Sequence, residues 1–216
     1  MKTFFLFSAL LLGLSTAPAV QAAPGSGLGS DDNTAIKKTS ADYRREVKTA
    51  SQALERAPRD GKLYRQRADA EIKLKDYKEA VADYTKAIQF KTIDADVYYN
   101  RGMALMQLKD YRKAVADFNL ALKLRPTDAG ALYARGVARV MAFDYKTAIV
   151  DFNKALTLDS TLADAYEYRG ISYSSLDKKD QACQDLARAV KLNPGAAKSQ
   201  RQYCKTCKSC DDVAAN

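Results

Sequence analysis

The chain has 216 residues, with 35 lysines and arginines against 26 aspartates and glutamates, and a formal net charge of +9. It contains no histidine, which excludes Ser-His-Asp and Cys-His catalytic pairs and imidazole metal ligands. Basic and acidic residues are interleaved along the chain, as in Lys109-Asp110, and this favours a solvated helical surface over nucleic-acid binding. We therefore expect a protein without enzyme activity, metal ion, cofactor or nucleic-acid partner.

The first 22 residues have the pattern of a secretory signal peptide. Lys2 precedes an apolar run from Phe4 to Leu14, and small residues follow as far as Ala22. The alternative is a membrane anchor, but the apolar run has about eleven residues, whereas roughly twenty are needed to cross a bilayer. We therefore expect residues 1–22 to be removed and the protein to be exported, to a periplasm or outside the cell, without stable membrane insertion.

The next two segments precede the regular part of the chain. Residues 23–39 are rich in glycine, serine and aspartate and are expected to form a flexible linker. Helical patterning begins near Ser40, a residue type that caps helix N-termini. Residues 40–60 place apolar side chains on one helix face and close at Pro58, so we expect a degenerate half repeat that acts as an N-terminal capping helix.

Four blocks of similar sequence follow, at residues 61–94, 95–128, 129–162 and 163–196. Each block has a small residue in its first half, and these residues are Ala68, Gly102, Gly136 and Gly170. Two alanines mark its second half, with a bulky residue between them: Tyr84, Phe118, Phe152 and Leu186. A period of this length is typical of helical solenoids, in which each helix pair buries its apolar face against its neighbours.

At these residues the chain resembles the tetratricopeptide repeat (TPR) family. The resemblance implies an all-α fold, a right-handed helical-hairpin solenoid of TPR repeats with N- and C-terminal capping helices. Residues 197–216 are then the C-terminal cap and tail. The small residue Gly102 should let two helices approach closely, and Tyr98 is expected to pack with Phe118.

An arginine in the first half of each block is matched by an aspartate in the second half. The pairs are Arg67 with Asp83, Arg101 with Asp117, Arg135 with Asp151, and Arg169 with Asp185. The recurrence predicts an ion pair across each pair of helices, because every arginine has its own counter-charge. The alternative is a ladder of arginines that binds an anionic ligand.

A second stripe runs along the first helix of each repeat, one residue away from the packing stripe, and it is apolar and aromatic in the middle repeats but polar at both ends. In the family's stacked helix pairs, the corresponding stripe lines a concave groove. Exposed apolar surface of this kind favours a partner site, and methionines suit an adaptable surface. The alternative is that one of the chain's own terminal segments covers it. The candidate partner-binding residues are Ile72, Tyr99, Met103, Met106, Tyr133, Val137, Val140 and Met141.

The family's best-known ligand mode grips a C-terminal carboxylate with lysine, asparagine and arginine. Of that set only Asn100 is present, while Arg65, Asp69, Gly130 and Ala134 occupy the other matching places. We therefore expect this carboxylate clamp to be absent.

All four cysteines lie late in the chain, at Cys183, Cys204, Cys207 and Cys210. An even number of cysteines in an exported chain favours disulfides. The first choice is Cys183–Cys204 with Cys207–Cys210, although zinc or an iron–sulfur cluster is an alternative for this spacing.

The sequence therefore favours an exported scaffold or adaptor that binds a protein or peptide partner through an apolar, aromatic groove. The expected setting is envelope biogenesis or assembly, with another envelope protein as the partner. The alternative function is a redox or metal-binding protein that acts through the C-terminal cysteine cluster.

Overall fold

The computed structural model describes residues 38–204, and this part of the chain is built from helices without any strand. The elements are α1 (Ser40–Arg56), α2 (Gly61–Leu74), α3 (Tyr77–Gln89), α4 (Ala95–Gln107), α5 (Tyr111–Leu124), α6 (Ala129–Met141), α7 (Tyr145–Leu158), α8 (Ala163–Ser175), α9 (Lys179–Leu192), a 3-10 turn η1 (Pro194–Ala196) and α10 (Ala197–Tyr203). The predicted signal peptide, most of the predicted linker, Cys207 and Cys210 lie outside the described residues.

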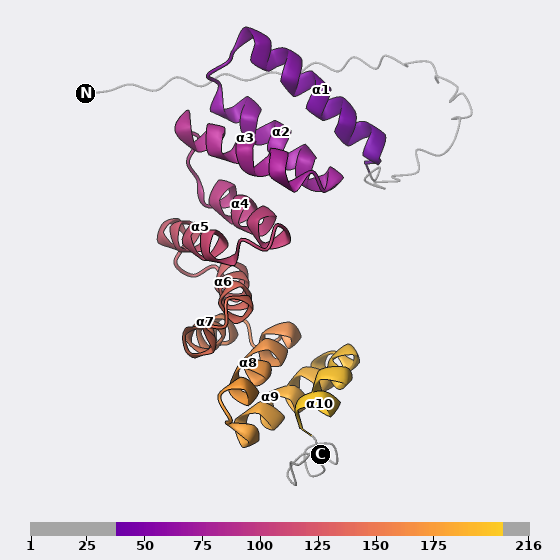
Figure 1. The fold of residues 1–216 in the computed structure, drawn as a ribbon, viewed down its shortest axis with the longest axis vertical. Coiled ribbons are helices and arrows are strands. Elements are labelled where there is room, and N and C mark those ends of the chain that lie inside the picture. The colour runs from indigo at the N-terminus through magenta and orange to yellow at the C-terminus, as the bar shows by residue number, and fades with distance from the viewer. Residues whose placement is uncertain (1–37, 205–216) are drawn as a thin grey trace, which may run out of the picture. The chain divides into compact units, whose positions relative to one another are not determined.

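Consecutive helices pack as antiparallel pairs, stacked in chain order (Figure 1). The even-numbered helices α2 to α8 are the first helices of the four repeats, and the odd-numbered helices α3 to α9 are the second helices. Each first helix also contacts the first helix of the next repeat, so α2, α4, α6 and α8 form one continuous layer. The predicted all-α helical-hairpin solenoid is confirmed. Within residues 38–204, the helices are all too short or too polar to cross a membrane.

Aspartates fix the start of three first helices. The carboxylates of Asp60, Asp94 and Asp128 accept hydrogen bonds from backbone N–H groups in the first turns of α2, α4 and α6. The N-cap of helix α1 is Thr39, and the prediction of Ser40 as the cap is wrong by one residue. The Thr39 hydroxyl accepts from the Asp42 N–H while the Asp42 carboxylate accepts from the Thr39 N–H, so the reciprocal capping box decides the boundary.

The corner between the two helices of each repeat uses a left-handed residue. Lys75, Lys109, Phe143 and Asp177 occupy it, with φ between 57° and 67°. The following N–H then bonds to a carbonyl in the last turn of the first helix, as from Asp144 to Arg139 at 2.8 Å. Phe143 is unusual there, because it is a bulky residue in a strained conformation and is 78% exposed.

Replacing Phe143 with glycine should raise the free energy of unfolding by roughly 0.5–1 kcal/mol. Glycine relieves the strain of the left-handed conformation, and this gain exceeds the entropy that glycine adds to the unfolded chain. Urea denaturation provides the measurement. Phe143→Lys is the matched control, since lysine occupies this corner in two other repeats and keeps the strain. A gain of equal size in the lysine variant would show that the exposed ring, and not the backbone, is responsible.

The small residues of the first helices make room for the largest buried side chains of the second helices. A Cβ atom on Gly102 would lie 2.8 Å from the Phe118 ring, and one on Gly136 would lie 2.6 Å from the Phe152 ring. Both rings are fully buried. Tyr99, and not Tyr98 as predicted, provides the aromatic contact to Phe118, with ring centroids 5.7 Å apart.

The predicted arginine–aspartate pairs are confirmed in all four repeats. Each arginine donates from Nε and Nη2 to the two carboxylate oxygens of its aspartate, over 2.5–2.9 Å. Its Nη1 donates to a polar side chain on the preceding helix, which is α1 for Arg67 and a second helix for the other three, over 2.7–3.0 Å. These acceptors are Ser51, Thr85, Asn119 and Asn153. The arginines therefore tie neighbouring repeats together, which favours a structural role over an arginine ladder for an anionic ligand.

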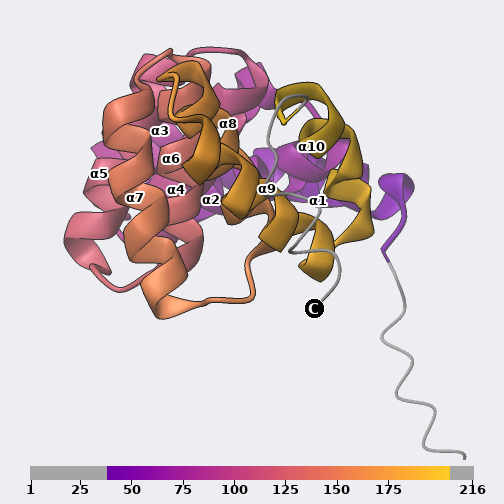
Figure 2. The same cartoon turned by 90° about the horizontal axis from the view of Figure 1, so that it is seen from below.

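Both ends of the described helices are covered by additional elements. Helix α1 packs on α2, and its Ser51 accepts a hydrogen bond from Arg67 Nη1, as side chains of the second helices do from the arginines of the later repeats. At the other end, η1 and α10 pack on α9 and α8, and Figure 2 shows α10 beside α9.

Candidate functional site

The first-helix stripe consists of the predicted residues that lie half-buried along α2, α4 and α6: Ile72, Tyr99, Met103, Met106, Tyr133 and Val137. Each of them packs its inner part against buried core residues. Because α2, α4 and α6 contact one another in turn, the stripe crosses three repeats. The exposed parts of these side chains form an apolar surface, and their contacts with the core hold them in place.

Two of the predicted partner-binding residues lie elsewhere. Val140 is only 7% exposed and belongs to the core cluster around Phe152, so its side chain packs inside the protein and is not accessible to a partner. Met141 is the last residue of α6 and is 41% exposed. It lines a cavity of about 400 Å³ at the helix corners, together with Phe143 and residues 109–112. Neither residue is part of the first-helix stripe.

Aromatic contacts extend the stripe toward α8. The Tyr133 ring lies 6.2 Å from the Phe152 ring and 6.2 Å from the Tyr168 ring. Sequence patterning missed Tyr168, because the matching position is Gln66, Asn100 and Ala134 in the other repeats. Burial raises the pKa of Tyr99, Tyr133 and Tyr168, and nearby carboxylates add to the effect: Asp128 for Tyr99, and Asp164 and Glu167 for the other two.

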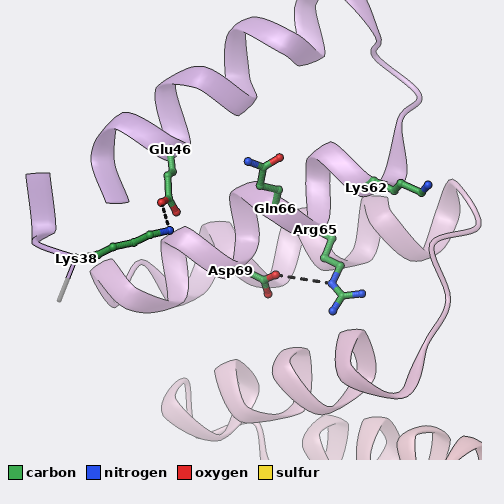
Figure 3. A pocket seen from close by; sticks show the side chains of 6 residues that line it. All are labelled: Lys38, Glu46, Lys62, Arg65, Gln66 and Asp69. Atoms are coloured by element: carbon green, nitrogen blue, oxygen red, sulfur yellow. Dashed lines mark hydrogen bonds and ion pairs between the residues drawn. The ribbon is translucent and has the colours of Figure 1, made fainter. Parts of the chain in front are cut away.

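The N-terminal end of the first-helix layer is polar. A cavity of about 380 Å³ lies between α1 and α2, lined by Lys38, Glu46, Lys62, Arg65, Gln66 and Asp69 (Figure 3). Within it Lys38 pairs with Glu46, and Arg65 Nε lies 3.7 Å from Asp69 Oδ2. Asp69 also accepts hydrogen bonds from the Tyr84 hydroxyl and, at 3.4 Å, from the Asn100 amide.

These contacts bear on the carboxylate clamp of the resemblance. The amide of Asn100, the one matching residue, already donates to a carboxylate of the chain itself. A second carboxylate from a peptide would be repelled by Asp69, since like charges at this range destabilise each other. The geometry therefore gives a physical reason to expect no such clamp.

The two described cysteines lie near the C-terminal end of the helices. Cys183 is buried on α9, and Cys204 is half-buried directly after α10, a helix that packs on α9. Cys207 and Cys210 lie outside the described residues, so the predicted disulfide pairing stays a prediction. Among residues 38–204, histidine, cysteine, aspartate and glutamate form no group of three or more suited to a metal ion.

Known protein families and structures resemble this chain. The family model described as "Tetratricopeptide repeat" matches residues 95–128, a second of the same description matches 164–196, and one described as "TPR repeat" matches 68–109. Comparison with curated proteins gives no match.

Three solved structures illustrate the similarity of fold. One is "YrrB: a TPR protein with an unusual peptide-binding site", with a TM-score of 0.71 and 21% identity over 75% of this chain and 84% of that one. MamA aligns with a TM-score of 0.68 and 19% identity over 73% and 92%. The first TPR of Spaghetti (RPAP3), bound to an HSP90 peptide, aligns with a TM-score of 0.50 and 23% identity over 52% and 91%.

The segments that the family models match are the same segments that form helix pairs and carry the repeated sequence pattern. The small residues that admit the buried rings and the alanines of the second helices are the same residues that carry the repeat pattern. This chain is a member of the tetratricopeptide repeat family.

Proposed function

We propose that the chain is a non-enzymatic scaffold that binds a protein or peptide partner through the first-helix stripe. One observation carries the proposal: apolar and aromatic side chains remain half-exposed along three adjoining first helices, although stacking of the repeats does not require it. Exposed apolar surface of this kind is characteristic of partner sites. The peptide-bound RPAP3 structure and the peptide-binding site named for YrrB support this use of the fold.

The proposal also includes an exported location and a partner in the cell envelope. The support is the signal-peptide pattern of residues 1–22, where Lys2 precedes a short apolar run. Fractionation of cells that produce the full chain, with and without residues 1–22, tests the location. Retention of both forms in the cytoplasm would contradict it.

The stripe is tested by replacing Tyr99 and Tyr133 together with alanine. Peptides are first selected on the full chain from a displayed library of random dodecapeptides, and their dissociation constants are measured by fluorescence polarisation. The double variant should bind the selected peptides at least tenfold more weakly, about 1.4 kcal/mol, because aromatic anchors carry much of an interface's free energy. Binding should persist at high salt, since apolar contacts are not screened.

The matched control replaces Tyr111 and Tyr145 with alanine. These are the half-buried tyrosines that begin α5 and α7 in the same two repeats. This control should leave binding within twofold. Tyr111 also lines the corner cavity that contains Phe143. If the control variant loses binding while the Tyr99 and Tyr133 variant keeps it, the partner binds at the corner and the stripe is the wrong site.

A further inference from the structure

Helix α2 of the stripe carries both lysines and carboxylates, whereas the charged residues of α4, α6 and α8 are arginines and carboxylates. The arginines of α4, α6 and α8 all bond to aspartates of the second helices. Setting these arginines aside, every charge on the three helices and their N-caps is negative: Asp94, Asp96, Asp128, Asp164 and Glu167. The whole chain carries a net charge of +9, so this row of carboxylates runs against the overall balance.

The negative charge is least compensated at α8. Near α4, Arg65 pairs with Asp94 and Arg125 pairs with Asp96. In contrast, the ion pairs found among residues 38–204 give Asp164 and Glu167 no basic partner. Glu167 accepts a hydrogen bond from the Ser199 hydroxyl of α10, which leaves its charge in place. Within the described part of the chain, the two carboxylates at this end of the stripe therefore have no basic counter-charge.

Two tyrosine rings lie beside these carboxylates. The Tyr133 and Tyr168 rings are 6.2 Å apart and inclined at 66°, so they form an edge-to-face corner. A cavity of about 200 Å³ opens between Tyr133 and the start of α8, lined by Tyr133 and residues 161–165, including Asp164. Burial raises the pKa of both tyrosines, and the negative charges of Asp164 and Glu167 raise it further.

We infer that the partner places a lysine or arginine side chain at this tyrosine corner, with its positive charge toward Asp164 and Glu167. The faces of aromatic rings attract cations, and the adjacent carboxylates strengthen the attraction. The apolar stem of a long basic side chain suits the cavity walls of Leu162 and Ala165. This inference rests on the proposed function and specifies its ligand as a peptide segment that combines apolar residues with a basic one.

The test uses the same library of random dodecapeptides on the full chain. Peptides selected on the wild type should be enriched in lysine or arginine beside apolar residues. Replacing Asp164 with asparagine and Glu167 with glutamine should weaken their binding at least tenfold, and so should glutamine in place of the peptide's basic residue. The matched control is Asp177→Asn with Asp180→Asn, the same charge change at exposed positions of the same repeat, and it should leave binding within twofold. Circular dichroism verifies the helix content of each variant.

The outcomes separate this inference from the proposed function. If binding depends on Tyr99 and Tyr133 but the peptides lack basic residues, or the Asp164 and Glu167 variant binds normally, the cationic ligand is wrong and the scaffold function stands. If the control variant weakens binding as much, the effect is one of net charge and the tyrosine corner is not the site. If no selected peptide binds through the stripe, the proposed function and the cationic ligand are both wrong.

Discussion

Replacing Asp151 with asparagine is expected to lower the free energy of unfolding by about 3–5 kcal/mol, because it leaves the partly buried charges of two arginines without a counter-ion. Asp151 is 1% exposed. Its carboxylate accepts from Nε and Nη2 of Arg135 at 2.9 and 2.6 Å, and from Nη1 of Arg139 at 2.6 Å. Asparagine keeps the size of the side chain but removes its charge and one acceptor, so two arginines lose their shared anionic partner.

Urea denaturation of Asp151→Asn alongside Asp185→Asn measures this effect. Asp185 occupies the same position in the last repeat, but among the described residues it accepts from Arg169 alone, so its replacement should cost less. The exposed Asp180→Asn variant should change the stability by less than about 0.5 kcal/mol. Equal losses at Asp151 and Asp185 would contradict the role given to the second arginine.

Replacing Glu71 with glutamine should stabilise the protein at pH 8 and have little effect at pH 4.5. Glu71 is 7% exposed, and its Oε2 is a buried oxygen without a hydrogen-bond partner among the described residues. The neighbouring Arg67 Nε lies 4.0 Å from Glu71 but bonds to Asp83 at 2.5 Å. Burial first, and then repulsion by Asp83, raise the pKa of Glu71 to about 7 despite the opposing effect of Arg67.

The direction of the pH effect follows from this raised pKa. The folded-state pKa of about 7 lies above the ordinary value of 4.5, so the contribution of Glu71 to stability is fully present below pH 4.5. It is lost as the pH rises through 7, because the unfolded chain then gains from ionisation that the folded chain resists. The loss approaches about 3 kcal/mol at pH 8. Glutamine removes this titration and should recover most of that amount.

Urea denaturation from pH 4.5 to 8 provides the measurement, with Glu55→Gln, an exposed carboxylate on α1, as the control. The stability of the control should follow the wild type at every pH, whereas the difference for Glu71→Gln should widen across the range. A constant difference between wild type and Glu71→Gln would show that burial does not perturb this carboxyl group.

The sequence by itself determined the fold and its recurring contacts. The repeated small residues and alanines specify helix pairs, because a helix pair can bury its apolar face only where the neighbouring helix leaves room. The ion pairs could be predicted for a similar reason: a charge at one position of every repeat, matched at a fixed separation, has the same neighbours each time. Arg101 and Asp117 therefore meet as Arg135 and Asp151 do.

Only the tertiary structure decided the features that differ between repeats or between adjacent residues. Helical periodicity places a side chain on a face of the helix, but the packing of the next repeat decides whether Tyr98 or Tyr99 meets Phe118 and whether Val140 stays accessible. Glu71 occupies the place in its repeat that Leu105 occupies in the next one, and it is polar where that residue is apolar. Its burial follows from neighbours on other helices. The Tyr133–Tyr168 corner joins positions that do not match in the repeat, so it becomes visible only when α6 and α8 pack together.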